Sequence, residues 1–329
     1  MKKNVTLLTF SILLISLSLL SLVIGYSKLG LMDLLATISG QANSATQLIF
    51  WKIRLPRLIV SILAGGALAM SGHLFQTLTR NPLADSGILG VNAGAGLLLT
   101  LALTLNITFP LSQPLLALIG GFLASGLVYL LAYKNGQALN PTRLVLTGVG
   151  LASLFSSCMI SLMVRFDRYQ LDTMIGWLSG RYVGDDWQTI HLISPLLLIL
   201  CVLSWFRFSK LNILQLEASL GIGLGLDRQK EATIVLILAT SLASFSSLLV
   251  GNTAFIGLLA SHLAKRLIGN QHQYSLPLAA LIGSSLLFSA DIFSRSLLVG
   301  TGIPTGLVIT LIGAPYFLFL LYSDKHSST

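Results

Sequence analysis

Long apolar runs dominate the chain and determine its predicted elements. A membrane-spanning helix needs about 20 mostly apolar residues. Candidate spans are residues 5–26, 56–78, 88–106, 114–133, 143–164, 190–206, 230–250, 254–268, 276–297 and 305–322. The runs are continuous rather than alternating, as from Leu192 to Leu203, which excludes a lipid-facing β-barrel. The pattern predicts one all-α polytopic membrane domain over residues 1–329, with about ten spanning helices.

The stretch from Arg54 to Gly96 combines three different patterns. It begins with two cations around a proline, continues as an apolar helix, and ends in a polar segment broken by proline and glycine, Asn81 to Gly94. One face of the helix carries small residues: Gly65, Gly66, Ala69, Ser71 and Gly72. Such a helix needs close neighbours or an open path beside it, and broken backbone is tolerated where it is buried or lines a cavity. We interpret the stretch as part of a pathway wall, with these five residues lining the pore.

Three segments are expected to lie outside the membrane. Residues 27–53 are moderately amphipathic and external, and residues 166–189 are external, aromatic and charged. Residues 207–229 form the longest internal loop, and its core from Leu211 to Asp227 is apolar. An apolar internal loop predicts a docking surface for another protein. A helix lying on the membrane surface is the alternative.

Composition supports the membrane class. The 329 residues are 54% hydrophobic and only 9% charged, with a mean hydropathy of +0.85, whereas soluble domains carry roughly 25% charged residues. The net charge of +9 fits orienting loops and contact with anionic lipid. The sequence has no arginine-rich patch with interleaved aromatics, so we expect no nucleic-acid partner.

The distribution of lysine and arginine gives the predicted orientation. Lys2 and Lys3 precede an apolar stretch that is too long for a typical signal peptide, so we expect a first spanning helix with a cytoplasmic N-terminus. An even number of spans places the C-terminus in the cytoplasm too. Twelve cations then lie inside and eight outside, which is the correct sign but a weak bias. The excess of outer arginines calls for another explanation, such as an acidic partner on that face.

Signatures of catalysis and of metal binding are missing. The chain contains no G-x-x-x-x-G-K-S/T phosphate loop, no H-E-x-x-H and no G-x-S-x-G. The five histidines are scattered, so neither a metal site nor a cofactor is predicted. Cys158 and Cys201 lie in apolar runs and are interpreted as small core residues. Asp291 and Arg295 are four residues apart, the spacing of an ion pair on one helix.

Several short motifs together resemble a known family, the permease subunits of ABC importers for ferric siderophores, haem and cobalamin (the FecCD or BtuC type). Their order and spacing along nearly the whole chain carry the resemblance. The motifs are Arg54-Leu-Pro-Arg57, Asn81-Pro-Leu-Ala-Asp-Ser-Gly-Ile-Leu-Gly90, Asn92-Ala-Gly-Ala-Gly96, Trp177-Leu-Ser-Gly180, Leu211-Asn212 with Leu224-Gly225, Phe255-Ile-Gly-Leu, His262-Leu-Ala-Lys-Arg266, Ala290-Asp291 and Gly313-Ala-Pro-Tyr316.

The resemblance implies a type II importer permease of ten helices in a bacterial inner (cytoplasmic) membrane. A second permease, identical or different, would complete the pore. Two ATP-binding subunits would bind the cytoplasmic face, and a periplasmic or lipid-anchored substrate-binding protein would deliver the cargo. The permease itself would catalyse nothing.

The resemblance also implies roles for individual residues. Outer arginines of the family dock the binding protein, and the matching positions are Arg54, Arg57 and Arg295. The cytoplasmic gate would include Asn81, Pro82 and Leu83. The ATPase-coupling segment would include Leu211, Asn212, Leu216, Glu217, Leu224 and Gly225. Two departures affect the expected ATPase contact: Glu217-Ala218 stands where the family has Gly-Glu, and Ser261 stands where it has proline.

The function expected from these observations is import of a ferric siderophore by alternating access, driven by ATP hydrolysis in the partner subunits. Haem or cobalamin as cargo is the nearest alternative. A secondary transporter is a further one, although the spans lack the carboxylate series that a proton-coupled carrier would often use. A polytopic membrane enzyme would need a polar catalytic cluster that the sequence does not show.

Overall fold

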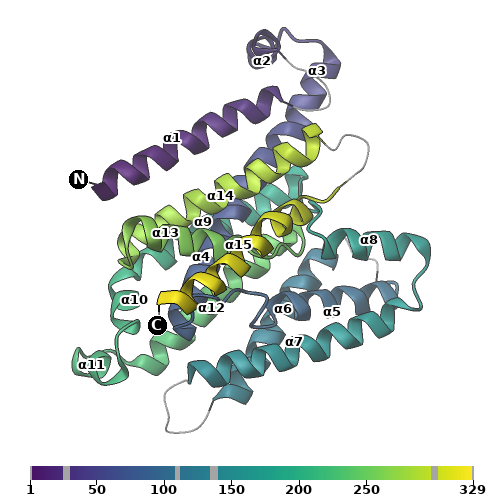
Figure 1. The fold of residues 1–329 in the computed structure, drawn as a ribbon. Coiled ribbons are helices and arrows are strands. Elements are labelled where there is room, and N and C mark those ends of the chain that lie inside the picture. Colours follow the sequence, from purple (N-terminus) through teal and green to yellow (C-terminus); the bar gives the residue numbers. More distant parts are fainter. Residues whose placement is uncertain (1, 25–29, 108–111, 134–139, 298–302, 328–329) are drawn as a thin grey trace.

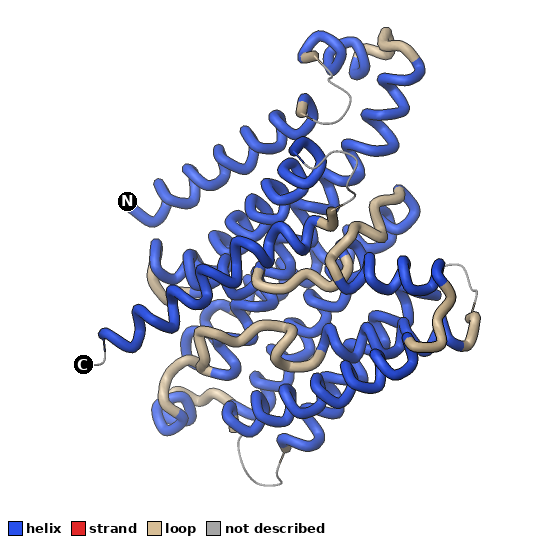
Figure 2. The backbone as a smooth tube through the Cα atoms, turned by 45° about the vertical axis from the view of Figure 1, so that its right-hand side comes forward, coloured by secondary structure: helices blue, strands red, loops and turns tan. Residues whose placement is uncertain are grey.

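The computed structural model describes residues 2–24, 30–107, 112–133, 140–297 and 303–327, and within these ranges helices are joined by turns and loops (Figures 1 and 2). The helices in chain order are α1 Lys2–Val23, α2 Leu31–Ile38, α3 Ser44–Ile49, the π-helical turn η1 Phe50–Arg54, α4 Leu55–Thr79, α5 Val91–Thr104, α6 Ser112–Ala132, α7 Pro141–Met163, α8 Arg168–Leu178, α9 Trp187–Phe206, α10 Phe208–Leu214, α11 Ala218–Gly223, α12 Arg228–Val250, α13 Ile256–Ile268, α14 His272–Leu297 and α15 Thr305–Ser327.

Each of the ten predicted spans coincides with one of these helices. Among the described residues, seven helices are long and apolar enough to cross a membrane. Six of them are α1, α6, α7, α9, α12 and α14, and the seventh is the continuous helix Ser44–Thr79, which includes α4. α5 is shorter, with 14 residues, and α13 has only 13. At about 1.5 Å of rise per residue, α13 falls well short of the roughly 30 Å hydrocarbon core.

Burial separates an interior set of helices from a peripheral set. In the most apolar 18-residue stretch of the helix that includes α4, and in that of α12, 78% of the residues are buried. The corresponding share is 6% for α1 and 17% for α7. α4 packs against α14, α12, α13 and α9, which makes it the central helix of the bundle (Figure 1). The peripheral helices present large apolar side chains to their surroundings, as expected where lipid is the solvent. Cys158 is exposed on α7, so the prediction of a core position is wrong for it, and Cys201 is half-buried.

Pairs of glycines allow the interior helices to touch backbone to backbone. A Cβ atom on Gly72 of α4 would lie 2.4 Å from the Cα atom of Gly257 on α13. A Cβ atom on Gly65 of α4 would lie 2.6 Å from the carbonyl oxygen of Gly283 on α14. These distances leave no room for any side chain, and close approach of this kind is how small residues hold membrane helices together.

α4 ends at a sharp break before α5. Arg80 has a left-handed backbone (φ 51°), and Gly90 has φ 75° at the start of α5. Residues 80–90 between them form turns rather than helix. The Asn81 Oδ1 atom accepts a hydrogen bond from the backbone N–H of Leu83 (2.9 Å), which fixes the first of these turns.

Both termini lie at the same end of the bundle. Lys3 near the N-terminus donates a hydrogen bond to the Gln271 side chain, just before α14 begins. α15 ends at the same end of the bundle, where α10 and α11 also lie (Figure 1). The structure therefore agrees with termini on one side, and the segment from α10 to α11 lies on that side with them.

The glycine contact between α4 and α13 leads to a stability prediction. Gly72→Ala forces the two backbones apart, and we expect it to lower the free energy of unfolding by about 1–3 kcal/mol, the range for overpacking a core. Thermal unfolding of the purified chain in detergent, followed by the loss of monodisperse protein, measures the change.

Gly150→Ala is the matched control, because nothing lies within 4 Å of a Cβ atom at Gly150 on α7. There the substitution should leave stability unchanged or raise it by about 0.5–1 kcal/mol through the higher helix propensity of alanine. Equal effects of the two substitutions would contradict the packing role of Gly72.

Candidate functional site

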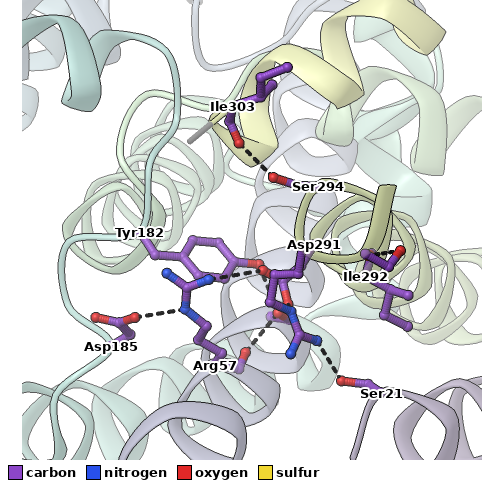
Figure 3. Close-up of polar contacts among 11 residues, drawn as sticks. Ser21, Arg57, Tyr182, Asp185, Asp291, Ile292, Ser294 and Ile303 are labelled. Carbon is purple, nitrogen blue, oxygen red and sulfur yellow. Dashed lines mark hydrogen bonds and ion pairs between the residues drawn. The ribbon is translucent and has the colours of Figure 1, made fainter. Parts of the chain in front are cut away.

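A network of charged residues surrounds Asp291 near the end of α14 (Figure 3). The Asp291 side chain is 1% exposed and forms ion pairs with Arg295, Nε to Oδ2 at 2.8 Å, and with Arg57, Nη1 to Oδ1 at 3.8 Å. Arg57 also forms an ion pair with Asp185, Nε to Oδ2 at 3.0 Å. Arg295 donates a hydrogen bond from Nη2 to the hydroxyl of Ser21 (2.8 Å). The network therefore connects α1, α4, α14 and the segment between α8 and α9.

Tyr182 contacts this network through both its ring and its hydroxyl. The Arg57 guanidinium lies over its ring, 5.5 Å from the centroid. Its hydroxyl shares a 2.8 Å hydrogen bond with Ser61 of α4. Burial raises the pKa of the Tyr182 phenol, and the nearby Asp291 carboxylate raises it further, so the hydroxyl stays protonated and available for this bond.

The predicted docking arginines are mostly occupied within the chain itself. Arg54 is 2% exposed and donates to the backbone carbonyl of Leu22. The side chain of Arg295 is 13% exposed, and that of Arg57 is 30% exposed. The acidic partners of Arg57 and Arg295 are Asp185 and Asp291 of the same chain, not only groups on another protein. Contacts within the chain therefore satisfy these three arginines, and their role in docking a binding protein stays a prediction.

Sequence reasoning missed Tyr182, Asp185 and Ser61 as members of this site. The signal available for Asp185 was the motif Gly184-Asp-Asp-Trp187, which places two acids among apolar spans on the same predicted face as the unexplained arginines. Nothing in the local pattern around Ser61 distinguishes it from other serines in α4. Only the packing of α4 beside the segment from α8 to α9 brings these residues together.

The predicted gate residues lie at the opposite end, where α4 breaks. Pro82 is exposed, while Asn81 and Leu83 are half-buried. The neighbouring Asp85 ties this segment to the start of α13, because its carboxylate accepts hydrogen bonds from the backbone N–H groups of Ser86 (2.8 Å) and Phe255. Burial raises the pKa of the Asp85 carboxyl to about 6, although these two hydrogen bonds act in the opposite direction.

The predicted coupling residues divide into an anchored group and an exposed group. Leu211 of α10 is buried, and the Asn212 side chain accepts a hydrogen bond from the backbone N–H of His272 (2.9 Å). Leu216, Glu217, Leu224 and Gly225 are exposed around α11. Arg80, which precedes the predicted gate residues, donates to the backbone carbonyl of Leu216, one of the predicted coupling residues.

The five predicted pore-lining residues of α4, Gly65 to Gly72, are all buried against other helices of the same chain. Gly65 and Gly66 face α14, Gly72 faces α13, and Ser71 donates a hydrogen bond to the carbonyl of Ala239 on α12 (2.7 Å). Within this chain the five residues therefore pack helix against helix, and their pore-lining role stays a prediction.

The chain matches a family of membrane permeases over almost its full length. Residues 13–323 match the FecCD transport family. The chain is 37% identical over 310 residues to the iron(3+)-hydroxamate import system permease protein FhuG of Bacillus subtilis, with 92% of each chain covered. It is 36% identical over 312 residues to the ferric enterobactin transport system permease protein FepD of Escherichia coli, with 94% of this chain and 92% of that one covered.

The same relationship holds for a relative with a different cargo and for a solved structure. The chain is 35% identical over 291 residues to the hemin transport system permease protein HmuU of Yersinia pestis, with 86% of each chain covered. A solved metal-chelate type ABC transporter in an inward-facing conformation superposes with a TM-score of 0.84 at 28% identity, covering 97% of this chain and 99% of that one.

The fold and these matches define the class: a multi-pass, all-helical permease subunit of an ABC transporter, which is not itself catalytic. The chain belongs to the FecCD transport family.

The charge network around Asp291 leads to a second stability prediction. Asp291→Asn leaves Arg295 buried without its ion-pair partner, and we expect the free energy of unfolding to fall by about 3 kcal/mol. Asp172→Asn is the matched control, since Asp172 pairs with Arg181 on the surface with its side chain 71% exposed; its loss should cost about 0–1 kcal/mol. Thermal unfolding of the two variants decides, and equal losses would show that the buried network adds nothing.

Proposed function

We propose that the chain is the permease of an importer that carries a ferric siderophore across a bacterial cytoplasmic membrane. In this proposal it works as a single domain, pairs with a second permease, and binds two ATP-hydrolysing subunits. A substrate-binding protein delivers the cargo from outside. Both termini lie in the cytoplasm, together with α10 and α11.

The observation that supports this proposal best is the exposed apolar surface of the coupling segment. Leu220 is 57% exposed, Ile222 is 63% exposed and Leu224 is 61% exposed. These side chains surround a short helix at the end of the bundle that holds the termini (Figure 1). Such a cluster at the cytoplasmic end fits the docking of another protein, and anchoring through Leu211 and Asn212 would pass a push on α11 into α14 and the gate.

Docking of the binding protein is expected at the opposite end. Arg57 is the most exposed of the three predicted docking arginines. An acidic residue of the binding protein would compete there with Asp185, which already holds the Arg57 Nε atom. We propose that Arg57 makes the contact and that Arg54 and Arg295 hold the surface in shape from within.

Transport would follow from relative movement of tightly packed helices. The glycine contacts of α4 leave little space between backbones, so α4, α13 and α14 would move as one body. The break at residues 80–90 and the segment from α10 to α11 would then move against this body when the ATPase subunits close. The pathway itself would form at the contact with the second permease, because the small residues of α4 are buried within one chain.

The relatives support an iron-chelate cargo, and one specific observation favours haem as a second candidate. The identity to the hemin permease of Yersinia pestis, 35%, is close to that of the hydroxamate permease of Bacillus subtilis, 37%. Overall identity therefore does not separate the two cargoes.

Uptake in a strain that lacks the native importer separates these candidates. Expression of the chain with its partner subunits should restore uptake of a labelled ferric hydroxamate siderophore, and equal amounts of haem or cobalamin should compete poorly. Restored uptake of haem alone would transfer the assignment to the second candidate. Uptake that continues without an ATPase subunit and stops with an uncoupler would indicate a secondary transporter instead.

The coupling surface gives a separate test. Ile222→Glu places a charge in the centre of the apolar surface, and we expect the affinity for the ATPase subunit to fall by roughly tenfold or more. Co-purification of the ATPase subunit with the permease measures this loss. Met32→Glu, at an 80% exposed apolar position on α2, is the control that should leave co-purification unchanged. Unchanged co-purification with Ile222→Glu would place the ATPase contact elsewhere.

A further inference from the structure

A pocket of about 270 Å³ opens beside the break in α4, at the end of the bundle that holds the termini. Its walls come from five parts of the chain: the end of α4, the predicted gate segment, the residue after α10, α13, and the turn between α13 and α14. The lining residues are Gln76, Thr77, Arg80, Pro82, Gln215, Lys265 and Asn270. The volume lies just below the range of about 300–1,000 Å³ for drug-sized ligands, so the pocket fits a small ligand with some water.

The charges of this pocket are all positive. Arg80 and Lys265 line it, and no aspartate or glutamate is among its lining residues. Arg228 of α12 adds a third cation nearby, because it and Arg80 both donate to the backbone carbonyl of Leu216. Within the described ranges, none of these three cations forms an ion pair with a carboxylate. Like charges gathered without a counter-charge favour the binding of an anion.

Gln76 supplies an unused donor to the same pocket. The residue is 3% exposed, and its Oε1 atom accepts a hydrogen bond from the Lys265 Nζ atom (2.9 Å). The contact with an ammonium group fixes the orientation of the amide, since a flipped amide would turn its own donor toward Lys265. The Nε2 atom is then buried with no hydrogen-bond partner among the described residues. A buried donor without a partner is rare in proteins.

We propose that this pocket binds a small oxyanion of the phosphate type. Its ligands would be the Lys265 ammonium, the Arg80 guanidinium and the Gln76 amide N–H. Oxygen-rich anions fit this set better than a monatomic ion, because a guanidinium offers parallel donors that match two oxygens of one group. Free phosphate and the headgroup of an anionic lipid offer the same chemistry.

The position of the pocket gives the anion a consequence. Pro82 belongs to the gate segment, and Gln215 precedes the exposed part of the coupling segment. Gln215 donates to the backbone carbonyl of Asn270 (3.2 Å) on the opposite wall. An anion held between these walls would tie the gate, α13 and the coupling segment together at their junction.

Thermal unfolding of the full-length permease tests the proposal. The protein is purified in phosphate-free buffer and uncharged detergent, and inorganic phosphate is titrated at constant ionic strength with chloride as the balance. We expect a saturable rise in Tm, because a ligand that binds only the folded state stabilises it. Lys265→Gln should weaken the apparent affinity by about tenfold or more, as expected for loss of a charge-assisted hydrogen bond.

Two further variants complete the design. Lys230→Gln removes a cation from the exposed surface of α12 and should respond to phosphate as the unmodified protein does. Gln76→Glu places a carboxylate of nearly the same shape between the cations. It should raise Tm without phosphate and abolish the phosphate response. The proposal is overturned if Gln76→Glu neither raises Tm without phosphate nor abolishes the phosphate response. It is also overturned if Lys265→Gln responds to phosphate as the unmodified protein does.

Two additional experiments distinguish a lipid headgroup, the free ion and a partner protein as the source of the anion. In bilayers of phosphatidylglycerol rather than phosphatidylcholine, a Tm rise that depends on Lys265 identifies a lipid headgroup as the source, whereas an unchanged phosphate response identifies the free ion. If phosphate has no effect but Lys265→Gln weakens assembly with the ATPase subunits, the pocket receives a carboxylate of that partner and the proposal is wrong. These measurements follow ligand binding and subunit assembly rather than transport, so their outcome does not depend on which cargo the permease carries.

Discussion

Backbone contact between α4 and its neighbours is the constraint on which the rest of the structure depends. Gly65 meets Gly283 of α14, and Gly72 meets Gly257 of α13, at distances that exclude any side chain. In lipid there is little hydrophobic force between helices, so close packing and internal hydrogen bonds must hold the bundle together. Because α4 is held between its neighbours in this way, its two ends have defined positions, and the charge network and the turns at residues 80–90 adjoin those ends.

The two ends of α4 handle charge differently. At the end near Arg57, cations and carboxylates neutralise each other in a network that connects α1, α4, α14 and the segment before α9. At the end near Arg80, cations gather without carboxylates around a pocket. Leaving a buried charge unpaired is strongly destabilising, so the paired charges at the first end fit a structural role. At the second end the cations that line the pocket have no carboxylate beside them among the described residues, which fits the binding of an anion.

Much of the architecture could be predicted from the sequence, because lipid makes length and apolarity decisive. Continuous apolar runs of about 20 residues have only one stable form in a membrane, the helix, and every predicted span is a helix in the structure. The apolar loop at residues 207–229 was also recognisable, since leucines and isoleucines in a loop depart from the usual polar pattern. The pair of Arg295 with Asp291 was predictable from its spacing of four residues, whereas the contacts of Arg54 with Leu22 and of Arg295 with Ser21 were not, because those partners belong to a helix distant in the sequence.

The sequence by itself determined the membrane class, the helical spans, the break after α4 and the family to which the chain belongs. Only the tertiary structure decided what the small residues of α4 do. A row of glycines is compatible with an open path and with close packing, and the choice depends on whether another backbone lies against it. The same holds for Arg57: a cation in the sequence shows that a counter-charge is needed, while its source, here Asp185 and Asp291 of the same chain, is set by how distant segments come together in space.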